Sequence, residues 1–155
     1  MSDLGDLIAP EAVMADLSVT SKRALFQALG RLAHDAMQLD EIAVTQRLSD
    51  REKLGTTGFG SGVAIPHAKL PELDRVRGAF VRLARPIGYP AVDNLPVDLV
   101  LLLLSPEDSG ADHLKALARV SRRLRDASLA AKLRGAQSRD AIYALLTGGE
   151  PSHGG

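Results

Sequence analysis

The chain has 155 residues, enough for a single domain with a full hydrophobic core, and its 19 basic and 19 acidic side chains cancel. This balance and an aromatic content of 3% exclude the two usual features of a nucleic-acid binder, a basic field and aromatic platforms that stack on bases. The absence of cysteine excludes disulfides and thiolate metal sites. No stretch reaches the roughly 18 apolar residues of a membrane span, and the N-terminus lacks a basic signal region. We therefore expect a cytoplasmic protein without membrane insertion.

Two helices are predicted in the first third of the chain. The first covers about residues 20–38, with Ser18, Thr20 or Ser21 as its cap. Its apolar stripe consists of Leu25, Ala28, Leu29, Leu32, Ala33 and Ala36. Asp40 is the predicted cap of the second helix, which runs to about Lys53 and whose apolar members are Ile42, Val44 and Leu48.

The most informative segment is residues 51–67, with the sequence REKLGTTGFGSGVAIPH. Its glycines predict a loop, because glycine weakens the interior of a helix or a strand. Residues 63–65 are predicted to form a brief buried strand, since the residue before a proline favours extended geometry. His67 then follows the end of a strand, on a backbone stiffened by Pro66 and beside free loop N–H groups. A positioned imidazole next to backbone donors is suited to group transfer.

The second half of the chain predicts strands followed by helices. A strand is expected at residues 77–83, a loop at 86–96, and a central strand covered on both faces at 97–104, where the sequence is VDLVLLLL. Helices are expected from about residue 109, over 128–134 and over 138–146. We therefore predict an α/β fold, a mixed β-sheet sandwiched between helices on both faces, in one domain over residues 1–147 with a disordered tail at 148–155.

Two of the four histidines are candidates for chemistry. His67 lies at a strand end and His113 in the first turn of the helix that follows the central strand. Strand ends and helix starts meet at the functional edge of α/β sheets, so the two rings are candidates to share a cleft. The alternative is that each histidine merely caps or packs locally. The Gly-rich segment does not fit a dinucleotide fingerprint, a phosphate-binding P-loop or a nucleophile elbow, because the required helix, lysine or outer glycines are missing.

The segment resembles the active-site signature of the fructose/mannitol-type enzyme IIA domains of the bacterial phosphoenolpyruvate-dependent phosphotransferase system. Every constrained position of that signature is matched; the matching residues are Glu52, Phe59, Gly60, Val63, Ala64, Ile65, Pro66, His67 and Ala68. The resemblance extends from about Leu7 to Leu146. Within the family the chain is most similar to the nitrogen-regulatory branch, through its free-standing domain, Thr56-Thr57-Gly58 before the histidine and Lys69-Leu70 after it.

The resemblance implies a phosphotransferase without a cofactor or metal, which carries a phosphoryl group on His67. The group would come from a phosphorylated HPr-like carrier, and the phosphorylation state would control regulatory target proteins that the sequence does not identify. Arg51 matches the active-site arginine and His113 the second histidine of the family. Backbone N–H groups of Gly60, Ser61 and Gly62 are expected to hold the phosphoryl oxygens. Phe59, Val63 and Leu70 are expected to form an apolar rim for partners.

Two other functions stay open at this point. One is a sugar-specific IIA component of a transport system. The other is a metal-dependent hydrolase that uses His67, His113 and a carboxylate such as Asp98.

Overall fold

A leucine-rich strand, β6 (Val97–Pro106), forms the centre of the molecule in the computed structural model, which describes residues 4–91 and 93–148. All six side chains from Leu99 to Leu104 are inaccessible to solvent. Strand β5 (Arg77–Ile87) pairs with β6 in antiparallel orientation on one side. On the other side lie two short parallel strands, β3 (Val63–Ala64) and β4 (His67–Leu70). The predicted central strand is confirmed, because an apolar run without a polar face needs cover on both faces.

Six strands form one mixed sheet. Strand β1 (Ile8–Leu17) adds to β5 in parallel, and β2 (Gly58–Gly60) adds to β3 in antiparallel orientation. The strand order is β1-β5-β6-β3-β2. Strand β4 also pairs with β6, at the residues of β6 that follow those paired with β3.

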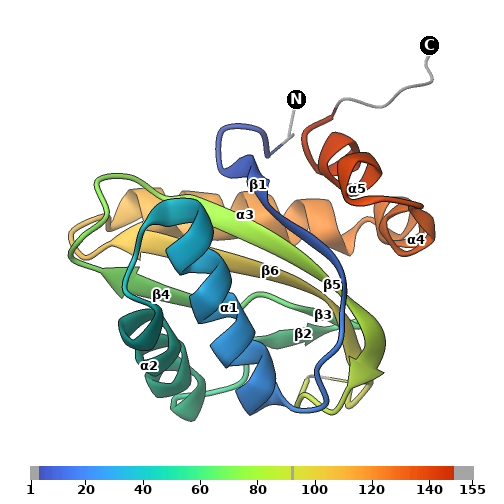
Figure 1. The fold of residues 1–155 in the computed structure, drawn as a ribbon, viewed down its shortest axis with the longest axis horizontal. Coiled ribbons are helices and arrows are strands. Elements are labelled where there is room, and N and C mark those ends of the chain that lie inside the picture. The colour runs from blue at the N-terminus through green and yellow to red at the C-terminus, as the bar shows by residue number, and fades with distance from the viewer. Residues whose placement is uncertain (1–3, 92, 149–155) are drawn as a thin grey trace.

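Helices cover both faces of this sheet (Figure 1). Helices α1 (Lys22–Met37) and α2 (Glu41–Lys53) lie on the near face, and α3 (Ala111–Arg125) lies behind the sheet. The last two helices of the described residues are α4 (Ala127–Gly135) and α5 (Arg139–Leu146), and α5 contacts β1. The predicted α/β fold with a mixed sheet between helices is therefore confirmed.

Three helix caps follow from the sequence. The side chain of Ser21 accepts a hydrogen bond from the Ala24 N–H, and Ser138 caps α5 in the same way. Asp40 accepts from two backbone N–H groups at the start of α2. Each cap supplies an acceptor for an N–H group that the first helical turn leaves unpaired, which stabilises a helix by about 1 kcal/mol.

The strand predictions were incomplete. Strand β1 was not predicted, because Pro10 and two register irregularities in its pairing with β5 break the alternation of apolar and polar residues. Strand β5 continues to Ile87 into the expected loop, across another irregularity. The glycine segment, expected to be all loop, contains β2, whose weak intrinsic preference is overridden by pairing with β3.

Within residues 4–91 and 93–148, no helix is long and apolar enough to cross a membrane. Most of the predicted tail, residues 149–155, lies outside the described residues.

Candidate active site

His67 lies where the chain changes from one short strand to the next. It is the first residue of β4 and pairs with Leu103, whereas β3 ends at Ala64. The strand predicted at residues 63–65 is thus one residue shorter, and His67 begins a further strand that was not predicted; Ile65 and Pro66 separate the two. This break turns the Ile65 carbonyl toward the ring, and its oxygen lies 2.8 Å from His67 Nδ1. A carbonyl only accepts, so Nδ1 carries the proton and the lone pair of the neutral ring is on Nε2.

The surroundings of His67 favour the neutral imidazole. Burial of the half-buried ring is the main cause that lowers its pKa below the ordinary 6.5. The hydrogen bond to Ile65 and the charge of Glu52 oppose this shift, while the charge of Arg51 adds to it. The ring is therefore held in the state that has a nucleophilic nitrogen at neutral pH.

His113 lies beside His67. The two ring centroids are 5.5 Å apart, with the ring planes tilted by 50°. His113 comes from the first turn of α3, and its side chain is buried. Burial is the main cause that lowers its pKa, and the charge of His67 when that ring is protonated, together with the charges of Lys69 and Arg51, lowers it further.

Ser105 determines the tautomer of His113. Its hydroxyl, on the last part of β6, is fully buried and lies 2.6 Å from His113 Nδ1. Among the described residues Ser105 Oγ has no other hydrogen-bond partner. If Nδ1–H were the donor, the hydroxyl proton would be buried without an acceptor, which is costly. The hydroxyl therefore donates to Nδ1, and His113 carries its own proton on Nε2.

This assignment gives a prediction. In Ser105→Ala, His113 Nδ1 loses its donor, so we expect the ring to change from one tautomer to a mixture of both. Two-bond 15N–1H correlation spectra of the imidazole rings measure this directly. Ser109→Ala is the matched control, because the buried Ser109 hydroxyl has no partner among the described residues. An unchanged His113 spectrum in Ser105→Ala would contradict the assignment.

Arg51 completes the cluster. It lies in the last turn of α2, and one of its terminal nitrogens donates to the Gly55 carbonyl at 2.9 Å. Together with His67 and His113 it lines a cavity of about 390 Å³. The other lining residues are Arg47, Asp50, Leu54, Ala68 and Lys69. Three permanent cations against one carboxylate make this cavity attractive to an anion, and an arginine fork is suited to a phosphoryl group.

The sequence analysis missed two residues of this site, Arg47 in the cavity lining and Ser105 behind His113. Arg47 is four residues before Arg51 and hence on the same face of α2, a signal that was available. It donates to the Lys69 carbonyl and pairs with Glu107, so it ties α2 to β4 and to the end of β6. Ser105 could not have been found, because nothing in its local sequence indicates that it faces His113.

Glu52 has a supporting role that the sequence does not reveal. Its buried carboxylate accepts from the Thr57 N–H and hydroxyl and pairs with Lys22 at 3.3 Å. Tyr89 hydrogen-bonds to both Thr57 and Glu52, and burial is the main cause that raises the pKa of this phenol, which keeps it a donor. The network fixes the end of α2 to the chain that leads into the glycine segment.

The structure does not bring the glycine loop to His67. Val63 pairs with Leu99 and His67 with Leu103, so the loop lies four residues along β6, roughly 13 Å away. None of Gly60, Ser61 and Gly62 lines the cavity. All three have positive φ, and the Ser61 N–H donates to Asp93. The loop geometry therefore serves a tight turn held by Asp93, and we do not include these residues in the site.

The expected apolar rim is corrected at two of its three residues; the third, Phe59, is half-buried. Val63 and Leu70 are buried in the core, because both lie on strands beside β6. Instead, Leu54 is 84% exposed and lines the cavity, and Leu114, next to His113, is 66% exposed.

The three residues of the hydrolase hypothesis do not converge. Asp98 lies five residues along β6 from the partner of His67, roughly 16 Å away, and its carboxylate pairs with Arg134. Within the described part of the chain, no group of three or more histidine, aspartate or glutamate side chains is placed to hold a metal ion. The hydrolase hypothesis therefore lacks the convergent side chains that it requires.

Comparison with known proteins is consistent with this geometry. The family model described as "Phosphoenolpyruvate-dependent sugar phosphotransferase system, EIIA 2" matches residues 6–148. A nitrogen regulatory protein of Bradyrhizobium diazoefficiens is 53% identical over 141 residues, which are 91% of this chain and 92% of that protein. The nitrogen regulatory protein of Escherichia coli K12 is 38% identical, over 93% of this chain and 89% of the relative. The crystal structure of nitrogen regulatory protein IIA-Ntr from Neisseria meningitidis superposes with a TM-score of 0.87 at 35% identity, covering 93% of this chain and 99% of that one.

Proposed function

Because this chain belongs to the EIIA 2 family of the phosphoenolpyruvate-dependent sugar phosphotransferase system, we propose that it is a regulatory phosphocarrier that accepts a phosphoryl group on Nε2 of His67. The observation that carries the proposal is the bond from His67 Nδ1–H to the Ile65 carbonyl, which leaves Nε2 as the nucleophile in a cationic cavity. The donor is a small HPr-like carrier phosphorylated on histidine.

The transfer needs only the groups at this site. The lone pair of His67 Nε2 attacks phosphorus in line, the P–N bond to the carrier breaks, and the carrier's imidazole keeps that electron pair. His67 Nδ1–H stays on the Ile65 carbonyl throughout. Arg51 and the Nε2–H of His113 supply positive charge and hydrogen bonds to the phosphoryl oxygens. Positioning and charge stabilisation of this kind are the main requirements of phosphoryl transfer.

The cavity rim supports a transient protein partner. Exposed Leu54 lines the cavity with the cations Arg47, Arg51 and Lys69, and exposed Leu114 follows the lining residue His113 in the chain. Apolar anchors within a charged rim are typical of short-lived interfaces. A phosphoryl group on His67 adds about −1.5 to −2 charges here, by analogy with hydroxyl phosphates. We propose that this change in charge decides which target proteins bind.

The nitrogen-regulatory role is preferred over the sugar-specific one. The relative with 53% identity and the superposed Neisseria structure are both nitrogen regulatory proteins. A sugar-specific IIA component would pass its phosphoryl group on to a IIB partner and then to a sugar.

The test is phosphorylation of the purified chain. Incubation with phosphoenolpyruvate, enzyme I and the HPr-like carrier is expected to add the mass of one phosphoryl group, stable in base and labile in acid. No mass change with an active carrier would refute the proposal.

The lowered pKa of His67 gives a prediction on pH. Only the neutral ring is nucleophilic, and a depressed pKa keeps it neutral to lower pH. We therefore expect the ring to titrate with a midpoint below 6.5, and the phosphorylation rate to stay above half its maximum at pH 6.5. NMR titration of the ring protons measures the midpoint without the carrier. A midpoint above 6.5 would show that Glu52 and the Ile65 bond outweigh burial.

A further inference from the structure

Thr57 joins the two segments of the chain that carry Arg51 and His67. It is 8% exposed and does not belong to the residues that line the His67 cavity. On one side, its N–H and its hydroxyl both donate to the carboxylate of Glu52, at 3.2 and 2.7 Å. On the other side, its carbonyl accepts from the Ile65 N–H at 3.0 Å. One buried residue is therefore hydrogen-bonded both to the neighbour of Arg51 and to the residue whose carbonyl orients His67.

The bonds to Glu52 determine where the guanidinium of Arg51 is held. The chain turns between Glu52 and Thr57, and within this turn the Gly55 N–H donates to the Glu52 carbonyl at 3.2 Å. The Gly55 carbonyl, which accepts from Arg51 at 2.9 Å, thus lies in a short segment that is tied to Glu52 at both ends. The Thr57 hydroxyl supplies the shortest of these ties. Without it, the carbonyl that orients the guanidinium is held less firmly.

The bond to Ile65 determines where the ring of His67 is held. Ile65 is 3% exposed, its N–H donates to Thr57, and its carbonyl accepts from His67 Nδ1–H at 2.8 Å. The next carbonyl, of Pro66, accepts from the Leu103 N–H on β6 at 3.0 Å. The direction of His67 Nε2 therefore depends on the placement of Ile65, and Thr57 fixes that placement from the side of β2.

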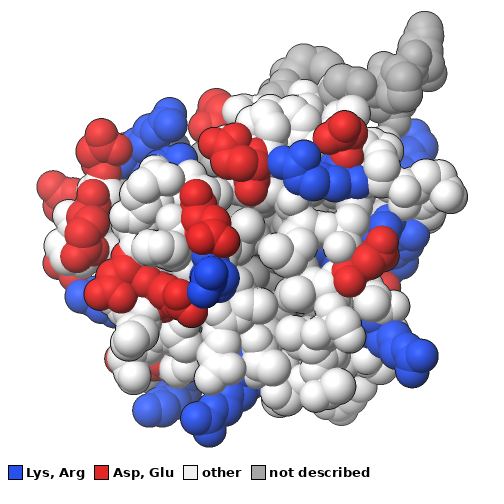
Figure 2. Space-filling view, in the orientation of Figure 1, with Lys and Arg blue, Asp and Glu red and all other residues white. Residues whose placement is uncertain are grey.

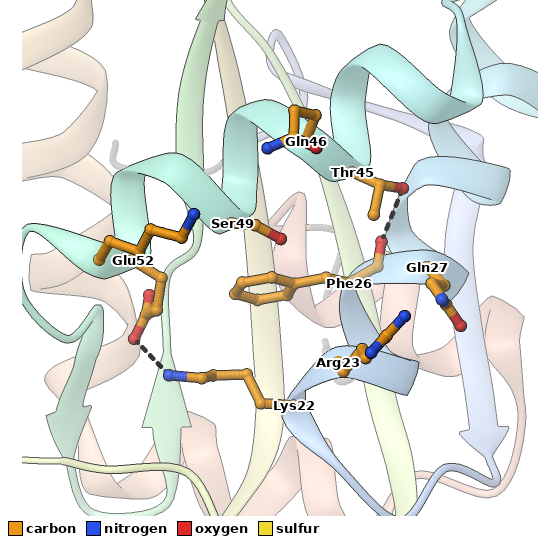
Figure 3. Close-up of a pocket in the computed structure, with 9 residues that line it drawn as sticks. Lys22, Arg23, Phe26, Gln27, Thr45, Gln46, Ser49 and Glu52 are labelled. Carbon is orange, nitrogen blue, oxygen red and sulfur yellow. Dashed lines mark hydrogen bonds and ion pairs between the residues drawn. The ribbon is translucent and has the colours of Figure 1, made fainter.

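Tyr89 and Lys22 complete the network around Thr57. An ionised carboxylate only accepts, so the Thr57 hydroxyl donates to Glu52 and its oxygen accepts from the Tyr89 hydroxyl at 2.6 Å. The Glu52 side chain is 6% exposed and reaches from the end of α2 to Lys22 at the start of α1, at 3.3 Å (Figure 3). Figure 2 shows Lys and Arg gathered at the lower edge of this face, where α1 begins and α2 ends, so positive charge lies beside the buried carboxylate. A buried polar network whose members are all satisfied gives one fixed geometry.

We propose that Thr57 is a positioning residue for the phosphoryl transfer, which holds the Arg51 guanidinium and the His67 ring in the relative placement that the transferred group requires. Thr57 does not touch that group; it acts through other residues on both sides. Misplacement of reacting groups by about 1 Å costs about 10²-fold in rate, so a smaller displacement gives a measurable loss. The effect on transfer rests on the proposed function, whereas the placement of the two side chains does not.

Two substitutions of Thr57 separate its hydroxyl from its shape. Thr57→Val keeps the shape and loses the hydroxyl, whereas Thr57→Ser keeps the hydroxyl and loses a methyl group. We expect Thr57→Val to lower the maximal phosphorylation rate about tenfold at an unchanged KM for the carrier, because Thr57 is buried and outside the cavity lining. Thr57→Ser should restore the rate to within about twofold of the native chain. Equal rates in the two variants would overturn the proposal.

NMR of the side chains separates positioning from stability. The 15Nε–1H relaxation of Arg51 and the solvent exchange of the His67 Nδ1 proton are measured in the unphosphorylated chain, without carrier. In Thr57→Val we expect Arg51 to become more mobile and the His67 proton to exchange faster, while Arg47, which Glu107 holds, keeps its mobility. Rates are compared per folded molecule, as given by thermal unfolding. Slower phosphorylation with both signals unchanged would overturn the proposal.

Thr45→Val is the matched control. The Thr45 hydroxyl also lies on α2 and is partly buried, but it donates to the Glu41 and Phe26 carbonyls, on the side of the helix that faces α1 (Figure 3). Its loss should change the phosphorylation rate less than about twofold, because Thr45 shares no partner with the Thr57 network. A loss as large as that of Thr57→Val would show a general effect of removing a hydroxyl from this region and overturn the proposal.

Tyr89→Phe tests the same arrangement by a milder change. It removes only the outer donor and leaves the Thr57 hydroxyl on Glu52, so we expect a loss of about threefold in rate and a smaller gain in Arg51 mobility. An unchanged Arg51 signal both here and in Thr57→Val would overturn the proposal. A chain whose Arg51 and His67 signals change as expected, but which is never phosphorylated, refutes the proposed function and leaves Thr57 as the residue that places the two side chains.

Discussion

His67→Ala is expected to take up no phosphoryl group from the phosphorylated carrier. The variant lacks the only described imidazole whose Nδ1 is tied to a backbone carbonyl in this cavity and whose Nε2 is thereby free to attack. His113 cannot replace it, because Ser105 holds the opposite tautomer, with the proton on Nε2. Intact-mass measurement after incubation with phosphoenolpyruvate, enzyme I and the carrier gives the result directly.

Two controls make this result specific. His113→Ala keeps the nucleophile and should still be phosphorylated, more slowly. His67→Ala loses one hydrogen bond of a half-buried ring, worth about 1 kcal/mol, so it should remain folded in thermal unfolding. Acid-labile phosphate retained on His67→Ala would move the acceptor to another residue and remove the basis of the proposal.

The second large effect is expected at Arg51. Arg51→Ala should slow phosphorylation by about 10²–10³-fold, the usual cost of removing one donor that stabilises charge in a transition state. Arg51→Lys keeps the charge and loses the planar fork, so an intermediate rate is expected. Reactions with a fixed amount of phosphorylated carrier, quenched at successive times and measured by intact mass, give the initial rates.

Stability separates a role in transfer from a role in folding. Arg51 is partly exposed and donates to one carbonyl at a helix end, so its loss should change the free energy of unfolding by no more than about 0.5 kcal/mol. Arg31→Ala, which removes the same charge from α1 away from the cavity, should leave the rate unchanged. A rate loss in Arg51→Ala that follows an equal loss of folded protein would make Arg51 a structural residue.

Much of the fold could be predicted because its signals are local. Asp40 caps α2 as expected since an aspartate before a helix accepts from N–H groups two and three residues on. The eight-residue run from Val97 to Leu104 is nearly all apolar and ends shortly before Pro106, which favoured a central strand covered on both faces. Strand β1 was not predicted because its burial pattern depends on irregular pairing with β5, whose paired residues are 66 to 70 positions away in the sequence.

At the site, neighbouring residues in the chain are enough to define the chemistry that is available. The run that ends in Pro66-His67 places an imidazole on a stiffened, extended backbone, and this follows from residues next to one another in the chain. The family signature on the same residues indicated a phosphocarrier, and the family match over residues 6–148 agrees with it.

The groups that surround that imidazole depend on how the strands and helices pack. It brings His113 to 5.5 Å from His67, assigns the two opposite tautomers through Ile65 and Ser105, and leaves the glycine loop at the far end of β3. The reason is physical. The Ser61 N–H donates to Asp93 and is therefore not free for a phosphoryl group, and the pairing register on β6 fixes the distance between the glycine loop and the His67 ring. Spacing along the chain constrains a residue's own backbone, whereas the partners of its side chain depend on register and packing that no local pattern encodes.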